Sequence, residues 1–241
     1  MSATTNATET VLTVDNVVKR FGGITAVDGA SFTVPKGKVT GVIGPNGSGK
    51  STMFNLITGV DTADSGTITY RGQNLVGKSS DAINHLGIGR TFQLTRLFGT
   101  MTVMENLTVV TQESFAVAEK RAEELLDNLG LIRLRNEYAM NLSYGQQKLI
   151  EFLRLSMIDT DLILLDEPFA GVNPIMEKKL LAQMDAWIKE GKTILLTDHE
   201  MAIMMEICDQ MYVFNYGSVI AHGTPAEVRE NPLVMEAYFG T

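Results

Sequence analysis

The chain has 241 residues, 44% of them hydrophobic, which is enough for one large α/β domain or one domain with a subdomain. Its formal net charge of -8 argues against nucleic-acid binding as its main function. The one cysteine, Cys208, excludes an internal disulfide, and no secretory signal or membrane span is expected, since no apolar run approaches the roughly 20 residues of a span.

The first third of the chain predicts antiparallel strands beside one buried strand. Apolar alternation predicts strands over residues 11–19 and 30–34, and the short apolar run 38–43 predicts a buried strand. A breaker-free helix is expected over 53–57, followed by strand 67–70 and the hairpin turn Arg71-Gly72. We therefore expect a small antiparallel β region at this end of the chain.

Residues 44–52 read GPNGSGKST and match G-x-x-x-x-G-K-[ST], the loop that wraps the phosphates of a nucleotide. The glycines let successive N–H groups turn toward an anion, and the following helix N-terminus adds partial positive charge. Lys50 would reach the β- and γ-phosphates, and the Ser51 hydroxyl would ligate Mg²⁺. The alternative is a Gly/Ser turn with a chance lysine. The predicted nucleotide-binding residues here are Asn46, Gly47, Ser48, Gly49, Lys50, Ser51 and Thr52.

The rest of the chain alternates strands and helices, with one helical block between them. An extended run over 87–93 is followed by helical patterns within 102–157, including a helix over 115–129 that ends at Gly130. Strands over 162–165 and 193–196 alternate with helices over 174–189 and 200–207, and strands 211–215 and 218–221 form a closing hairpin. This order predicts an α/β fold with a parallel sheet in residues 1–93 and 160–241, and an inserted helical subdomain in 94–159.

Two acids and one histidine follow the later buried strands. Asp166 and Glu167 come after four aliphatic residues, and ligands bind at the carboxyl ends of parallel strands. Asp166 is predicted to hold Mg²⁺ and Glu167 to orient and deprotonate the attacking water; the alternative is a pair of acids that caps the next helix. His199 is predicted to contact the γ-phosphate. The alternative is a histidine at a helix start that has no functional role.

Residues 142–147 read LSYGQQ and place Ser143, a good N-cap, with Gly145 and Gln146 at the start of a helix. This is a second helix N-terminus that faces an anion, and a simple phosphate-loop kinase has no need of it.

The phosphate loop, Gln93, residues 142–147, residues 162–167 and His199 occur in an order and spacing that resemble the ATP-binding cassette (ABC) ATPases. The resemblance implies a RecA-like parallel sheet with antiparallel β and inserted helical subdomains, and ATP hydrolysis with Mg²⁺. It implies head-to-tail dimers in which Ser143, Gly145 and Gln146 close over the partner's ATP. Gln93 would contact the metal with Ser51 and Asp166 and act in catalysis with Glu167 and His199. Phe21, otherwise a core residue, would stack on adenine, with Val27 beside the nucleotide.

The chain departs from the commonest cassette pattern at two positions, Tyr144 in place of glycine and Asn173 in place of aspartate. Residues 20–28, 89–93, 101–106 and 231–240 are similar to the ATPases of branched-chain amino acid importers. That resemblance implies a second ATPase chain, identical or related, two transmembrane permeases, an external solute-binding protein, and a peripheral location on the cytoplasmic face of the inner membrane.

Several alternatives stay open at this stage. Urea or amide importers and lipopolysaccharide exporters have similar ATPases, and soluble cassettes serve iron–sulfur assembly or DNA repair. A scaffold that binds nucleotide but barely hydrolyses it is a further reading. Leu97, Phe98 and Met101 would receive a permease helix or merely cover the helical subdomain. The methionines at 201, 204, 205 and 211 are interpreted as core filling, and His85 and His222 as surface residues.

Overall fold

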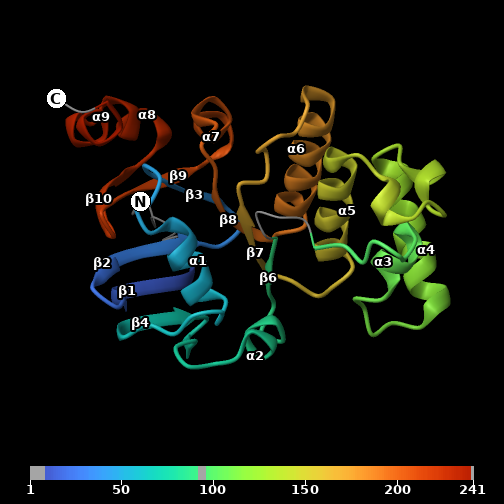
Figure 1. Cartoon of the computed structure of the whole chain (residues 1–241), viewed down its shortest axis with the longest axis horizontal. Coiled ribbons are helices and arrows are strands. Elements are labelled where there is room, and N and C mark those ends of the chain that lie inside the picture. Colours follow the sequence, from blue (N-terminus) through green and yellow to red (C-terminus); the bar gives the residue numbers. More distant parts are fainter. Residues whose placement is uncertain (1–8, 92–95, 240–241) are drawn as a thin grey trace, which may run out of the picture.

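A six-stranded sheet runs through the centre of the computed structural model, which describes residues 9–91 and 96–239 (Figure 1). Its strand order is β10-β9-β3-β8-β7-β6, and every neighbouring pair is parallel except β9 and β10. The strands are β3 (Val39–Ile43), β6 (Ile88–Arg90), β7 (Leu162–Asp166), β8 (Thr193–Thr197), β9 (Gln210–Asn215) and β10 (Ser218–Gly223).

The central strands β3, β7 and β8 are buried along their whole length, as their continuous apolar runs predicted. Successive residues serve two different cores. Leu162 and Leu164 belong to the core beside α1 (Lys50–Ile57), whereas Ile163 and Leu165 belong to the core under the later helices. Both faces of the sheet are therefore covered.

A second, antiparallel sheet has the order β2-β1-β4-β5, and its core-facing residues pack with those of α1. The hairpin turn between β4 and β5 has positive φ at Arg71 (46°) and Gly72 (79°), as a tight hairpin requires. The strands are β1 (Thr10–Phe21), β2 (Ile24–Pro35), β4 (Ser65–Tyr70) and β5 (Gln73–Asn74). The expected antiparallel region is confirmed, and β2 is longer than predicted.

The helical block lies between β6 and β7 in the chain. It comprises α3 (Val103–Thr108), α4 (Phe115–Asn128) and α5 (Tyr144–Ser156), with 3-10 turns at Ile132–Leu134 and Ala139–Asn141. α6 (Pro174–Lys189) packs on α5, where Trp187 stacks on Phe152 with ring centroids 5.3 Å apart. The α/β class with a helical insertion is confirmed. The exact domain boundaries remain a prediction.

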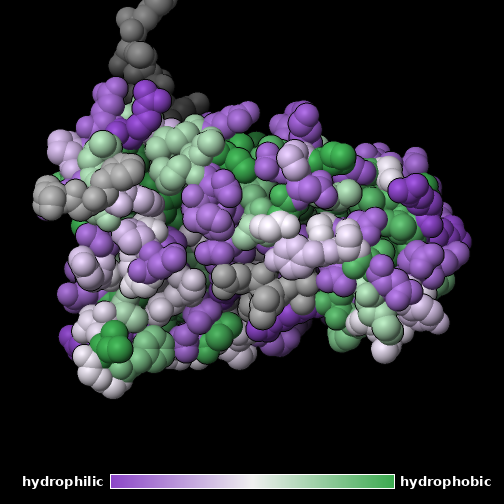
Figure 2. All heavy atoms as spheres, turned by 45° about the horizontal axis from the view of Figure 1, so that its top comes forward, coloured by the Kyte–Doolittle hydropathy of each residue, from purple (hydrophilic) through white to green (hydrophobic). Residues whose placement is uncertain are grey.

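The remaining helices are short. α7 (Met201–Ile207) was predicted, but α2 (Ser80–Asn84), α8 (Pro225–Glu230) and α9 (Pro232–Phe239) were not, because periodicity is weak over so few residues. The four methionines pack in or against the core, as interpreted. Hydrophilic and hydrophobic residues are interspersed on the face in Figure 2, and no helix within the described ranges could cross a membrane.

Candidate functional site

Three adjacent strands bring the predicted phosphate loop, the two acids and His199 to one edge of the sheet. β3 lies next to β8, and β8 lies next to β7, all parallel. Their carboxyl ends lead to the phosphate loop, to His199, and to Asp166 with Glu167, respectively. The topology therefore gathers residues that are more than 100 positions apart in the chain.

The phosphate loop presses closely against neighbouring backbone. A Cβ atom at Gly44 would lie 2.1 Å from the carbonyl oxygen of Phe214, and one at Gly49 would lie 2.4 Å from that of Ala26. Both glycines also have positive φ. Gly49 is the N-cap of α1 and offers no side-chain cap, so N–H groups at the start of the helix are left for a ligand.

Lys50 closes over the loop in this structure. Its ammonium donates to the carbonyl oxygens of Gly44 at 2.7 Å and Pro45 at 3.0 Å. Burial lowers the pKa of Lys50, while the carboxylates of Glu167 and Asp166 act in the opposite direction. The lysine thus lies within electrostatic reach of both acids and can exchange loop carbonyls for phosphate oxygens.

Ser48 supports the fit of an anion. Its hydroxyl is buried and has no hydrogen-bond partner among the residues placed in the structure. Asn46 and Gly47 are exposed beside it and line a cavity of about 530 Å³ with Tyr216. The loop therefore offers free donors to a phosphate chain.

The residues for Mg²⁺ also fit in type. Asp166 is buried at the end of β7, and the exposed Ser51 is the second residue of α1. Magnesium in phosphate sites takes hard oxygen ligands from one or two carboxylates and the substrate. No group of three or more acidic, histidine or cysteine ligands occurs in residues 9–91 and 96–239. Gln93, the remaining predicted ligand, lies outside the described residues.

Glu167 has an unusual backbone. Its φ is +50°, a left-handed conformation that is uncommon for a residue with a side chain, and its N–H donates to the carbonyl oxygen of Thr197 at 2.8 Å. His199 is 58% exposed, with Nδ1 3.6 Å from Asp198 and Nε2 3.8 Å from Glu200. His199 is exposed and Glu167 is half-buried at the sheet edge, and no hydrogen bond or ion pair joins these two side chains.

The two residues predicted to lie beside the nucleotide base, Phe21 and Val27, belong to β1 and β2. Phe21 is 45% exposed, with the Lys19 ammonium 5.2 Å from its ring centroid, so its ring is available to stack. Val27 is fully buried in the core and offers no surface to a nucleotide in this conformation. The contact of Val27 with nucleotide stays a prediction.

The Leu142–Gln147 stretch behaves as predicted locally. Ser143 caps α5 in a capping box, where its N–H donates to Gln146 Oε1 at 2.9 Å. Ser143 is exposed, Gly145 is buried against Met176, and none of these residues lines the cavity beside the phosphate loop. Figure 1 shows α1 and α5 on opposite sides of β7.

Three charged residues with buried side chains lie around the carboxylates and were not predicted from the sequence. Arg90 Nη2 pairs with Asp166 Oδ2 at 2.8 Å, Lys148 donates to the Glu167 carbonyl oxygen, and Asp198 accepts from the N–H of Phe169 at 3.0 Å. Arg90 is the last residue of β6 and Asp198 directly follows β8, and both of these strands lie next to β7. That position at the sheet edge is the signal by which they could have been found.

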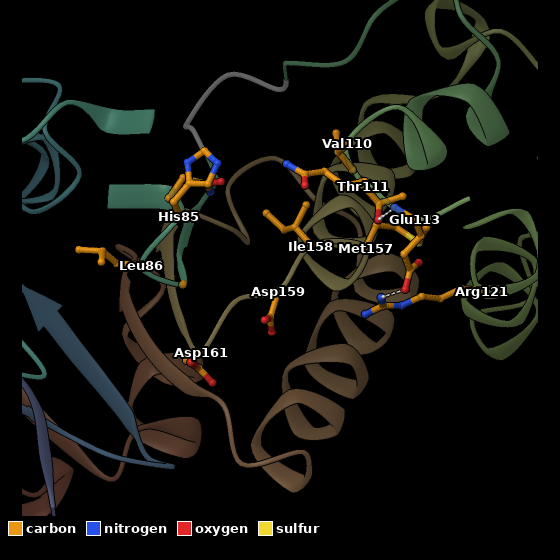
Figure 3. Close-up of a pocket in the computed structure, with 13 residues that line it drawn as sticks. His85, Leu86, Val110, Thr111, Glu113, Arg121, Met157, Ile158, Asp159 and Asp161 are labelled. Carbon is orange, nitrogen blue, oxygen red and sulfur yellow. Dashed lines mark hydrogen bonds and ion pairs between the residues drawn. The ribbon is translucent and has the colours of Figure 1, made fainter. Parts of the chain in front are cut away.

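A separate cleft of about 550 Å³ lies between the sheet and the helical block (Figure 3). His85 and Leu86 line one side of it, and Val110, Thr111 and Ile158 line the other. The ion pair of Arg121 with Glu113 closes one end. An adjoining hollow is lined by Phe98, Val110 and Leu155.

Comparison with known proteins agrees with this geometry. A family model described as ABC transporter matches residues 27–170, and one described as branched-chain amino acid ATP-binding cassette transporter matches residues 218–241. LivG of Salmonella typhimurium, a high-affinity branched-chain amino acid transport ATP-binding protein, is 38% identical over 95% of this chain and 98% of its own length. BraF of Pseudomonas aeruginosa, with the same description, is 36% identical over 95% of this chain and 98% of BraF.

Among solved structures, a nucleotide-free ATP-binding cassette from an ABC transporter superposes with a TM-score of 0.87 and 35% identity, over 97% of this chain and all of the other. An ADP-bound conformation of such a cassette gives 0.85 and 36%, with the same coverage. The phosphate loop, the carboxylates at the sheet edge and the helical insertion together place this chain in the class of phosphate-loop ATPases. Within that class, the chain belongs to the ATP-binding cassette family of ABC transporters.

Proposed function

We propose that this chain is the ATP-hydrolysing subunit of a transporter that imports branched-chain amino acids. The observation that carries the proposal is full-length similarity to LivG and BraF, together with the separate match of residues 218–241 to the branched-chain cassette model. The ATPase does not contact the solute, so this assignment rests on relatedness and not on the site.

The site supports hydrolysis by positioning and charge. The phosphates occupy the loop and the start of α1, and Lys50 shifts from Gly44 and Pro45 to the β- and γ-phosphates. Ser51, Asp166 and Gln93 would hold Mg²⁺, which would neutralise phosphate charge when bound. Glu167 orients the attacking water and accepts its proton, and His199 contacts the γ-phosphate.

A second ATPase chain completes the site. Ser143, Gly145 and Gln146 do not line the phosphate-loop cavity of their own chain, yet α5 presents a helix N-terminus suited to phosphate. We assign them to the ATP of an identical or related partner chain. Asn173 caps α6, because its side-chain oxygen accepts from the N–H groups of Ile175 at 3.0 Å and Met176 at 3.1 Å. The asparagine that stands here in place of the commoner aspartate therefore leaves the start of the helix intact.

Two permeases and an external solute-binding protein complete the transporter, which places this chain on the cytoplasmic face of the inner membrane. Phe98 is half exposed beside the hollow that adjoins the cleft in Figure 3. We assign this surface, together with Leu97 and Met101, to a permease helix.

Two experiments test these assignments. Glu167→Gln should bind Mg-ATP but nearly abolish turnover and trap the closed dimer; undiminished turnover would refute the role of Glu167. The solute is tested in vesicles that contain this chain with its co-purifying permeases and binding protein. Leucine, isoleucine or valine should stimulate ATP hydrolysis there, and stimulation by urea alone would contradict the assignment.

A further inference from the structure

Lys148 is a buried lysine on α5 with a residual exposure of 3%. A lysine is almost never this buried unless its ammonium is paired or hydrogen-bonded. Neighbouring positions on the same helix, such as Leu149 and Phe152, are occupied by ordinary core residues. The position therefore calls for an explanation beyond packing.

The partners of Lys148 are backbone carbonyls in the loop after β7. Its Nζ donates to the carbonyl oxygen of Glu167 at 2.6 Å and to that of Pro168 at 3.3 Å. The opposite side of the same peptide segment is held by β8, because the Glu167 N–H donates to Thr197. The left-handed backbone of Glu167 is thus fastened from two elements, α5 and β8.

Electrostatics and packing retain the ammonium there. Burial lowers the pKa of Lys148, and the carboxylates of Asp198, Glu151, Glu167 and Asp166 oppose that effect. Tyr144, one turn earlier on α5, covers the ammonium with its ring centroid 5.4 Å away.

Tyr144 also touches the far end of the same loop. A Cβ atom at Gly171 would lie 3.3 Å from Tyr144 Cε1. The tyrosine that replaces the commoner glycine therefore packs on the loop and shields Lys148 at the same time.

We propose that Lys148 is a positioning residue that holds the backbone of Glu167 in its left-handed conformation and couples it to α5. Movement of α5 then displaces the catalytic carboxylate of the same chain. Since Ser143 and Gln146 sit at the start of α5, closure on a partner's ATP is transmitted to the chain's own hydrolytic site. The inference rests on the proposed role of Glu167.

The test is Lys148→Met, which keeps the stem and removes the charged donor, in the full chain with Mg-ATP. We expect kcat to fall roughly tenfold, the loss expected for one hydrogen bond from a charged group, while KM for ATP stays within about twofold. Hydrogen exchange of the backbone amides in residues 169–172 should become faster. Lys148→Arg, which keeps both charge and donors, should recover most of the lost kcat.

Lys179→Met is the matched control. Lys179 is half-buried and also donates to a backbone carbonyl, that of Leu129, but it lies on α6 away from Glu167. It should lower the melting temperature without the selective loss of kcat. If Lys148→Met does not fold, Lys148→Gln takes its place. The glutamine side chain is uncharged and is one bond shorter than that of lysine.

Unchanged kcat in the Lys148 variant, or a loss that Lys148→Arg does not repair although it folds, would overturn the inference. If Glu167→Gln retains full turnover, the failure lies in the proposed catalytic role and not in the lysine contact. Slow turnover in Glu167→Gln with normal turnover in Lys148→Met leaves the proposed function standing and removes the positioning role.

Discussion

Replacement of Arg90 by methionine should strongly destabilise the protein. The Arg90 and Asp166 side chains are only 7% and 6% exposed, and their charged groups lie 2.8 Å apart. Arg90 also donates to Asn55 Oδ1 at 2.8 Å and to Thr58 Oγ1 at 3.1 Å, which ties β6 to α1. Removal of one partner of a buried ion pair costs about 3–5 kcal/mol, because the remaining charge loses its compensation.

Urea unfolding measures this cost through Trp187, the one tryptophan of the sequence, which is fully buried. Arg71→Met is the matched control. Arg71 lies 2.7 Å from Asp161, but these side chains are 41% and 49% exposed, so the expected loss is about 0–1 kcal/mol. Equal losses for the two variants would refute the argument that burial sets the value of the Arg90 pair.

The other predictions concern nucleotide binding and helix caps. Lys50→Ala should weaken ATP binding by roughly tenfold or more, and an unchanged nucleotide titration would contradict its role. Asn173→Ala should cost about 1 kcal/mol through loss of the α6 cap, seen as a lower Tm, whereas Asn173→Asp should not. Hydrogen bonds from the backbone N–H and the hydroxyl of Thr102 and Thr224 lower the pKa of Glu105 and Glu227 below the usual glutamate range. The stability they add is therefore present at neutral pH and is lost as pH falls through the lowered pKa values. Thr102→Ala and Thr224→Ala should therefore shift the urea midpoint less at pH 3 than at pH 7, and an equal shift would argue against the capping boxes.

Much of the site could be predicted because its parts are local. The phosphate loop needs positive φ at particular glycines, and the sequence shows glycine at those positions, as at Gly47 and Gly49. The N-cap role of Ser143 depends on Gln146, three residues away, so the pattern is visible without a structure. The strands before the phosphate loop and before Asp166 are short apolar runs.

The second contacts of the carboxylates could not be predicted in this way. Arg90 and Asp166 are 76 residues apart, and they meet only because β6 pairs with β7. Lys148 lies on a helix whose apolar pattern predicts core packing, and nothing near it in the sequence indicates the carbonyl of Glu167. The burial of Val27, expected beside the nucleotide, is likewise set by packing between β2 and α1.

The amino-acid sequence by itself determined most of the strands, the helices α1 and α4 to α7, the phosphate loop, and the acids and histidine that follow the buried strands. These depend on backbone preferences and periodicity within a few residues of each other. Only the tertiary structure decided which charges are buried together, since sheet order and helix packing bring distant residues into contact. Through those contacts, Arg90 holds Asp166 and Lys148 holds the backbone of Glu167.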